Sequence, residues 1–328
     1  MSMMIILFIS FILLSTFLHV WKLEATFLSF SFRLMDLSPQ QDDNNHHSFS
    51  KSLENCEAIN NVTGTKSPKT SFLVFVGAYE FFSPEMWRAV LVELVATACL
   101  LFTLTICILS CLESREPEPK LLVPFAVFII AFFFLLATVP LSGGHMSPVF
   151  TFIAALKGVI TLVRAIFYIL SQCVGSIMAY MVIKSVMNNA TVEKYSLGGC
   201  MIDGNGGGIA PGTALVLEFS CTFVVLFVGV TVAFDKRRFK ELGLIMVCVI
   251  LAASMGLAIF VSITVTGRAG YAGVGLNPAR CLGPALLHGG SLWHGHWVFW
   301  VGPCLACTVY YVYTLTLPRD RMGSVDED

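Results

Sequence analysis

The sequence predicts an all-α membrane protein with six transmembrane helices and two re-entrant half-helices in an inverted repeat. Three observations lead to this prediction. The chain is 56% hydrophobic and only 12% charged, whereas a soluble domain carries about 25% charged residues. It contains six apolar runs that are long enough to cross a bilayer. Two short motifs of its first half recur in its second half in the same order.

The apolar runs each approach or exceed the roughly 20 residues that a membrane helix needs. The predicted spans are 87–111, 121–141, 161–187, 213–233, 242–265 and 296–317. Strands of this length would be unusual in a membrane barrel, so the runs predict helices. The most basic connection, residues 235–240, predicts a cytoplasmic loop, and six spans then put both ends of this domain in the cytoplasm.

Two segments precede the spans. Residues 1–34 are an apolar extension that could be a signal-peptide core, a further span or a product of start-codon choice. They lack a basic start and a clear cleavage site, so we expect the native chain to begin at Met35. Residues 35–84 predict a polar, disordered tail. After the last span, residues 319–328 predict a cytoplasmic tail.

The internal repeat rests on two motifs. Glu93 to Thr97 in the first span matches Glu218 to Thr222 in the fourth, 125 residues later, and Ser147-Pro148 matches Asn277-Pro278, 130 residues later. One such match could be chance, but two in register indicate a repeat. Each half has three spans, so the second half enters the membrane from the opposite face.

The two Pro motifs each predict a half-helix. The apolar stretch after each motif is about ten residues, too short to span. Ser and Asn are good N-caps and Pro is favoured at the first helical position. The two N-termini should meet near the midplane, where non-helical backbone lines a cavity and positive partial charge opposes cations. The predicted constriction comprises Ser147, Pro148, Val149, Asn277, Pro278 and Ala279.

Four motifs resemble those of the major intrinsic proteins, the aquaporin and glyceroporin superfamily. They are Ser142-Gly-Gly-His145-Met-Ser-Pro-Val149, Tyr168-Ile-Leu-Ser-Gln172-Cys-Val-Gly175, Asn277-Pro-Ala-Arg280 and Trp297-Val-Phe-Trp300-Val-Gly-Pro303. The resemblance covers residues 85–318 and implies an aquaporin-like channel domain for small neutral solutes. It also implies a homotetramer embedded in membrane lipid, most simply the plasma membrane, with no enzymatic activity and no cofactor.

Within the superfamily the chain resembles the plant X-intrinsic proteins. The features of that subgroup are Leu197-Gly-Gly-Cys200, the placement of Cys281 directly after Arg280, and Ser147-Pro-Val149 where the superfamily has Asn-Pro-Ala. Ser is shorter than Asn and has one donor instead of two. This departure implies a first half of the constriction that is less polar than in a water channel.

The resemblance also implies an outer selectivity filter. Arg280 matches one filter position, and an Arg at membrane depth is usually functional. Val127 and Val274 match two others, although either could instead face lipid or pack in the core. The fourth lies within 254–266 and cannot be placed. Two Val beside an Arg predict a wide, apolar filter for solutes larger than water. The resemblance implies glycerol, urea, hydrogen peroxide or boric acid as these solutes. Other motif positions resemble those of water channels. The identity of the solute therefore stays open, and water is among the candidates.

The intramembrane carboxylates Glu93 and Glu218 allow two interpretations. They could relay protons, or they could accept hydrogen bonds from the re-entrant loops, with His145 and Gln172 giving further structural support. The second is favoured because the pair follows the repeat. A proton-relaying pair would suit the main alternative function, an inverted-repeat secondary transporter.

Other classes fit less well. An intramembrane hydrolase would need a nucleophile and a base facing one cavity, and His145 and Ser147 are too constrained for that. The net charge is −1 and no basic tract would track phosphates, so nucleic acid is not an expected partner. No Cys or His spacing suggests a metal site.

Two cysteines differ from the others, which lie mostly inside apolar runs. Cys200 and Cys281 fall on the extracellular side of the predicted topology. They predict a redox-sensitive pair that bridges within one subunit or between subunits. The alternative is a pair of separate thiols.

Overall fold

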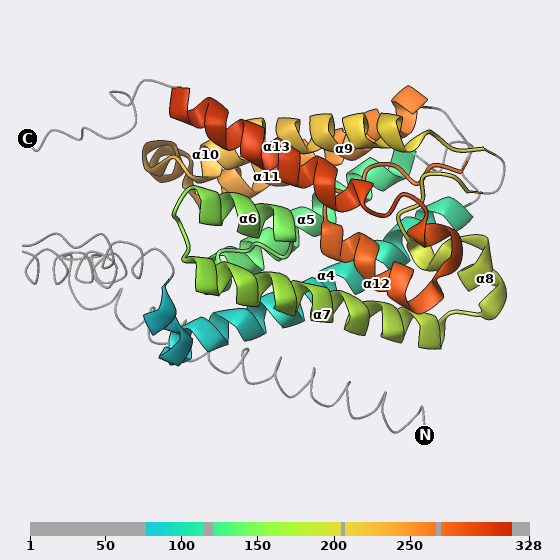
Figure 1. Ribbon diagram of the computed structural model, residues 1–328, viewed down its shortest axis with the longest axis horizontal. Coiled ribbons are helices and arrows are strands. Elements are labelled where there is room, and N and C mark those ends of the chain that lie inside the picture. Colours follow the sequence, from blue (N-terminus) through green and yellow to red (C-terminus); the bar gives the residue numbers. More distant parts are fainter. Residues whose placement is uncertain (1–76, 115–120, 205–206, 267–269, 317–328) are drawn as a thin grey trace, which may run out of the picture. The chain divides into compact units, whose positions relative to one another are not determined.

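Six long helices dominate the described structure (Figure 1). The computed structural model describes residues 77–114, 121–204, 207–266 and 270–316, all within one unit, Phe75–Asp328. In this part of the chain, six helices are long and apolar enough to cross a membrane: Pro84–Glu113, Leu122–Ser142, Leu162–Val186, Pro211–Ala233, Arg237–Thr266 and Gly290–Thr316. The predicted fold class is therefore confirmed.

The helices carry the following bounds in chain order. They are η1 (Ala78–Phe82), α4 (Pro84–Glu113), α5 (Leu122–Ser142), α6 (Pro148–Leu156), α7 (Leu162–Val186), α8 (Asn189–Lys194), η3 (Ser196–Gly198), α9 (Pro211–Val225), η4 (Leu226–Val230), α10 (Thr231–Ala233), α11 (Lys236–Thr266), α12 (Pro278–His288), η5 (Gly290–Trp293) and α13 (Val298–Thr316). The predictions for residues 1–34, most of the polar tail and residues 319–328 lie outside the described residues.

Ordered structure begins before the predicted end of the polar tail. The tail was predicted to reach residue 84, but η1 already forms a 3₁₀ helix. Glu80 explains the order, because its carboxylate accepts hydrogen bonds from Arg164 Nε at 2.9 Å and Thr161 Oγ1 at 3.0 Å. The carbonyl of Phe81 also accepts a bond from Trp87 Nε1 at 2.8 Å. These contacts tie η1 to the ends of α4 and α7.

The basic connection before the fifth span is helical, where a loop was predicted. Asp235 Oδ1 accepts bonds from the backbone N–H groups of Arg237 at 3.0 Å and Arg238 at 3.1 Å, which is the geometry of a helix N-cap. The helical turns then stop at Gly243, whose φ of 73° breaks the regular geometry. Residues 236–242 are thus a separate short helix ahead of the membrane-spanning part of α11.

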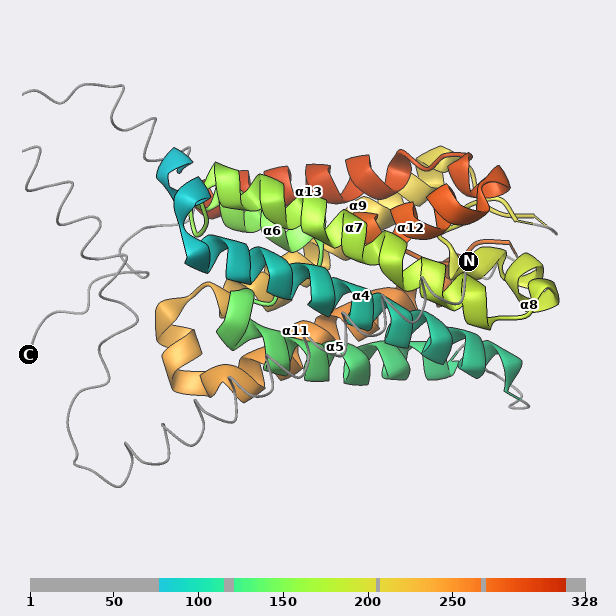
Figure 2. The same ribbon diagram turned by 90° about the horizontal axis from the view of Figure 1, so that it is seen from below.

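The two halves repeat one packing scheme. In the first half α4 packs on α5 and α7 (Figure 2). In the second half α9 packs on α11 and α13. Glycines permit the closest crossings. A Cβ on Gly175 of α7 would lie 2.5 Å from the carbonyl oxygen of Leu94, and one on Gly302 of α13 would lie 2.7 Å from Glu218 Cβ. Small residues at such crossings let membrane helices approach closely.

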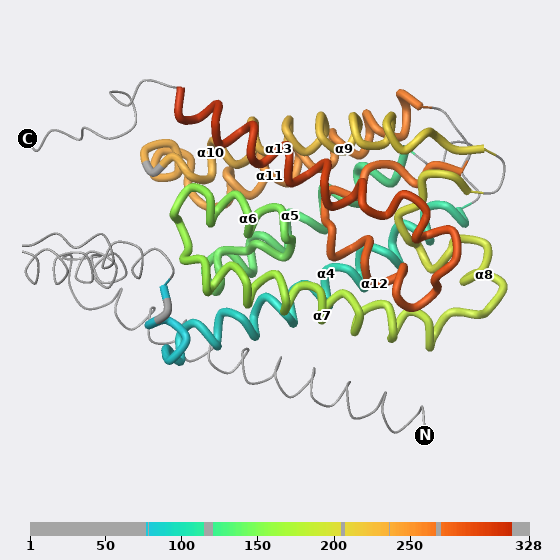
Figure 3. The backbone as a smooth tube through the Cα atoms, viewed as in Figure 1, coloured from blue at the N-terminus to red at the C-terminus, as the bar shows by residue number. Residues whose placement is uncertain are grey.

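The half-helices α6 and α12 lie end to end in the middle of the bundle, between α7 and α13 (Figure 1). Each contacts α7 and α13, so each packs against both halves. The tube in Figure 3 follows the chain from α7 through α8 toward α9 across the end of the bundle where α12 lies. This arrangement places the N-termini of α6 and α12 inside the protein.

Candidate functional site

The two half-helices begin with the same capping arrangement. Ser147 caps α6, and its Oγ accepts a hydrogen bond from the backbone N–H of Val149 at 3.3 Å. Asn277 caps α12, and its Oδ1 accepts from the backbone N–H groups of Ala279 at 3.0 Å and Arg280 at 3.4 Å. A proline follows each cap, where its missing N–H costs nothing.

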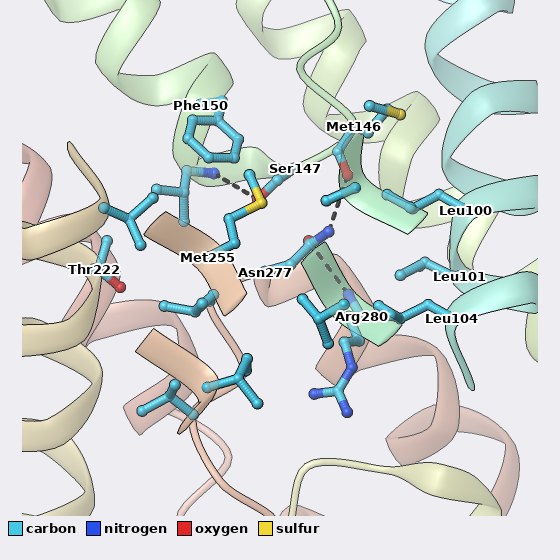
Figure 4. Close-up of a pocket in the computed structure, with 18 of the residues that line it drawn as sticks. Leu100, Leu101, Leu104, Met146, Ser147, Phe150, Thr222, Met255, Asn277 and Arg280 are labelled. Carbon is cyan, nitrogen blue, oxygen red and sulfur yellow. Dashed lines mark hydrogen bonds between the residues drawn. The ribbon is translucent and has the colours of Figure 1, made fainter. Parts of the chain in front are cut away.

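The two loops ahead of these helices meet directly. Asn277 Nδ2 donates a hydrogen bond of 2.9 Å to the carbonyl oxygen of Met146 (Figure 4). A side-chain amide has two N–H donors, so one remains free for a solute. Met146 and Leu276, the residues directly before the caps, both have left-handed backbone, with φ of 47° and 54°. Such backbone costs about 1–3 kcal/mol and persists only where its surroundings fix it.

Glu93 fixes the first loop. Its carboxylate is fully buried and accepts hydrogen bonds from the backbone N–H groups of His145 at 3.1 Å and Met146 at 2.7 Å. Gln172 Nε2 donates to it at 2.8 Å and Ser142 Oγ at 2.6 Å. A buried carboxylate is costly unless donors surround it, and here four donors do.

Glu218 fixes the second loop with fewer partners. It is also fully buried and accepts bonds from the backbone N–H groups of Gly275 at 2.5 Å and Leu276 at 3.3 Å. The preceding residue is held from α11, because the N–H of Val274 donates to Ser262 Oγ at 3.2 Å. Both intramembrane carboxylates therefore serve as acceptors for loop backbone.

The loops and parts of α4, α5, α9 and α11 enclose a cavity of about 120 Å³ (Figure 4). Most of its lining is apolar, with Leu100, Leu101 and Leu104 forming the α4 wall. The residues that the sequence predicted for the constriction and filter and that do line it are Val127, Ser147, Val149, Val274, Asn277 and Arg280.

Three residues predicted for the constriction do not line this cavity. Pro148, Pro278 and Ala279 are buried in the first turns of the half-helices. The carbonyl of Ala279 accepts a bond of 2.5 Å from Ser176 Oγ on α7. They serve helix packing, because the face toward the cavity is occupied by the cap side chains, by Val149 and Phe150 of α6 and by Arg280 of α12.

Three residues within the predicted range 254–266 line the cavity, Met255, Ile259 and Ile263, and sequence reasoning had not chosen among them. Ile263 is the one that packs beside the loop that carries Val274. It lines the cavity with Val127, Val274 and Arg280. A Cβ on Gly273 would lie 3.3 Å from its Cγ1, so its side chain packs against the loop that carries Val274. The longer connection after α11 hides this position in the sequence, because a fixed spacing back from Asn277 does not apply.

A disulfide joins Cys200 to Cys281 within the chain, with Cα atoms 5.1 Å apart. Cys200 follows η3 and Cys281 lies in the first turn of α12, so the bond ties the connection between α7 and α9 to the second half-helix. Arg280 Nη1 lies 3.2 Å from Cys200 Sγ. The disulfide therefore also lies beside Arg280, whose guanidinium lines the cavity.

A second cavity, of about 100 Å³, continues the path away from Arg280. It shares Leu135, His145 and Phe150 with the first cavity, so these side chains stand where the two meet. His145 is held there by Nδ1, which lies 3.1 Å from Thr151 Oγ1.

Six membrane-spanning helices surround two adjoining cavities, and two half-helix N-termini meet at the first of these. This arrangement is that of a membrane channel. The profile described as "Major intrinsic protein" matches residues 80–312. The chain therefore belongs to the major intrinsic protein family, whose members are channel proteins for water or small solutes and not enzymes.

Plant relatives agree with this assignment. The chain is 28% identical to aquaporin PIP2-5 of Zea mays over 268 residues, which cover 76% of this chain and 90% of that protein. It is 30% identical to aquaporin PIP2-7 of Musa acuminata, covering 70% and 82%, and 30% identical to the probable aquaporin TIP3-2 of Arabidopsis thaliana, covering 60% and 68%.

A solved structure supports the fold. The aquaglyceroporin from Plasmodium falciparum superposes with a TM-score of 0.58 at 19% identity, covering 71% of this chain and 96% of that one. At this identity the likeness concerns the architecture alone.

Proposed function

We propose that this channel passes small uncharged solutes larger than water, namely glycerol, urea, hydrogen peroxide and boric acid. The observation that carries the proposal is that Val127, Val274 and Ile263 line the same cavity as Arg280. None of the three is aromatic or ionisable, so a solute with carbon atoms meets apolar surface on one side and a guanidinium on the other. A narrow, polar ring would favour water.

The electrostatics support passive conduction of neutral molecules. The N-termini of α6 and α12 both point into the protein, and each carries about half a positive charge. Arg280 adds a full positive charge at the same cavity. A cation or proton is repelled there, whereas an oxygen acceptor can bind the free N–H of Asn277.

An ion-coupled transporter receives less support. Ion coupling needs a carboxylate open to the path, and neither Glu93 nor Glu218 is among the residues that line the two cavities. Both already accept hydrogen bonds from loop backbone.

We also propose that the chain belongs to one subgroup of the family. The Cys200–Cys281 pair, the Ser147-Pro-Val149 motif and the apolar filter together favour the plant X-intrinsic subgroup. By the same resemblance we propose a homotetramer in the plasma membrane, with one pore in each subunit.

The test is stopped-flow light scattering on proteoliposomes under separate glycerol and water gradients. We expect the wild type to pass glycerol well above empty liposomes. Val127→Phe should lower glycerol permeability about tenfold, or about 1.4 kcal/mol in the barrier, and retain water flux. Val216→Phe is the matched control, since Val216 is 62% exposed on α9. Wild-type vesicles that pass water but no glycerol would contradict the wide filter.

A further inference from the structure

The two cavities are separate voids, and the side chains that border both of them stand between them. In the described part of the chain three residues do so: Leu135 of α5, His145 of the first loop and Phe150 of α6. Each cavity also has a lining of its own, since Arg280 borders only the first and Phe239 only the second. A solute that crosses the protein must pass between the three shared side chains, which we call the inner neck.

Two sides of the inner neck are held in place. Leu135 is 2% exposed and belongs to a core cluster. His145 is fixed twice, because its backbone N–H donates to Glu93 at 3.1 Å and its Nδ1 lies 3.1 Å from Thr151 Oγ1. Neither side chain can move aside for a wider solute without loss of these contacts.

Phe150 forms the third side of the inner neck. Its ring packs against two core clusters, one containing Leu135 and the other containing Ile153, yet it stays only partly buried. Among the described residues that line the main cavity, it is the only one with a phenyl ring. In Figure 4 the ring and the Arg280 guanidinium lie at opposite ends of the cavity, with Ser147 between them.

The internal repeat gives Phe150 and Arg280 equivalent places. Phe150 directly follows Ser147-Pro148-Val149, and Arg280 directly follows Asn277-Pro278-Ala279, so each is the third residue of its half-helix. The repeat is inverted, so the two residues reach the path from opposite ends. One end therefore has a charged side chain and the other an apolar ring.

The ring is the larger obstacle to a wide solute. The other residues named beside Arg280 in the lining of the main cavity, Val127, Val274 and Ile263, are aliphatic and smaller than phenylalanine. A polyol that passes them still has to pass Phe150 before it enters the second cavity.

We propose that Phe150 is a specificity-determining residue that sets the largest cross-section of solute that the channel admits. This inference rests on the proposed function, because it concerns the size limit for the same neutral solutes. An unbranched polyol such as glycerol passes the inner neck end-on. A solute that branches at a central carbon has to displace the ring, and close packing against two core clusters resists that displacement.

The experiment compares erythritol with pentaerythritol in proteoliposomes, each corrected for empty liposomes. The two polyols carry the same number of hydroxyl groups, but erythritol is a linear chain and pentaerythritol branches at one carbon. The wild type should pass glycerol and erythritol and exclude pentaerythritol. Phe150→Val should raise pentaerythritol flux to about tenfold above the background of empty liposomes. Phe150→Leu, which retains more of the packing, should give a smaller gain in the same direction.

Two further variants separate the inner neck from other causes. Phe152→Val loses the same ring from the same half-helix, but Phe152 packs against a core cluster and lines neither cavity. Val127→Ala widens the main cavity instead. Both should still exclude pentaerythritol.

The proposal is overturned if neither Phe150 variant admits pentaerythritol, or if Phe152→Val or Val127→Ala admits it equally well. A gain of flux for one solute cannot result from misfolding, and a general leak would appear in Phe152→Val as well. Wild-type vesicles that pass no glycerol above empty liposomes would instead refute the proposed function itself.

Discussion

Removal of the Cys200–Cys281 bridge should destabilise the channel by an amount that the chain geometry bounds. The two cysteines are 81 residues apart, and loop-closure entropy for a flexible segment of that length gives about 4.5 kcal/mol. The segment contains α9 and α11, which stay helical in detergent, so the effective loop is shorter. We therefore expect about 2–3 kcal/mol, or roughly 4–12 °C in the apparent melting temperature.

The assay is thermal unfolding in detergent of Cys200→Ser, Cys281→Ser and the double variant. Either single change breaks the same bond, so the double variant should have the same melting temperature as each single variant. Reductant should lower the melting temperature of the wild type and leave these variants unchanged. Cys304→Ser is the control, since Cys304 is a free, exposed cysteine on α13. The reasoning would be refuted if the decreases in melting temperature of the two single variants added up in the double variant. It would also be refuted if reductant left the melting temperature of the wild type unchanged.

Two further predictions concern the helix crossing and the second loop. Gly302→Ala should lower stability by about 1–3 kcal/mol, because the new methyl would lie 2.7 Å from Glu218 Cβ, whereas Gly212→Ala meets nothing within 4 Å and should not lower the melting temperature. Glu218→Gln should cost about 1–3 kcal/mol and reduce solute flux, since its amide can accept only one of the two loop N–H bonds. Exposed Glu85 gives the matched control Glu85→Gln. Equal melting temperatures in either pair would contradict the packing or the hydrogen-bond argument.

Much of the fold could be predicted because the strongest signals are local or repeated. Span length and apolar composition identify the six helices without knowledge of their packing. The 125-residue spacing of Glu93 and Glu218 identifies the repeat, and capping preferences at Ser147 and Asn277 identify the half-helices.

The details that escaped prediction depend on three-dimensional placement. Ile263 could not be found because the connection before Val274 breaks the usual spacing. The helical nature of residues 236–242 depends on the cap at Asp235, which a charge count does not reveal. Phe150 and Arg280 hold equivalent places in the repeat, and only the packed structure shows that Phe150 lies where the two cavities meet.

The two re-entrant loops are held by different kinds of interaction, a hydrogen bond in the first half and a disulfide in the second. This difference has a consequence for the order in which the two loops become fixed. Gln172 supports the first loop through Glu93. The residue at the corresponding place in the second half, 127 positions later, is Phe299, which offers no hydrogen bond. The covalent bridge to Cys281 supplies the missing support.

Disulfides form in oxidising compartments and not in the cytosol. In the topology that the sequence predicts, Cys200 lies on the extracellular side. With that topology the hydrogen bonds of the first loop can form as soon as its helices insert, whereas the disulfide of the second loop can form only after Cys200 has crossed the membrane. A newly made subunit would carry a complete inner half of the pore while its outer filter is still unlocked. With that topology, oxidation of Cys200 and Cys281 would complete the support of the second loop only after membrane insertion.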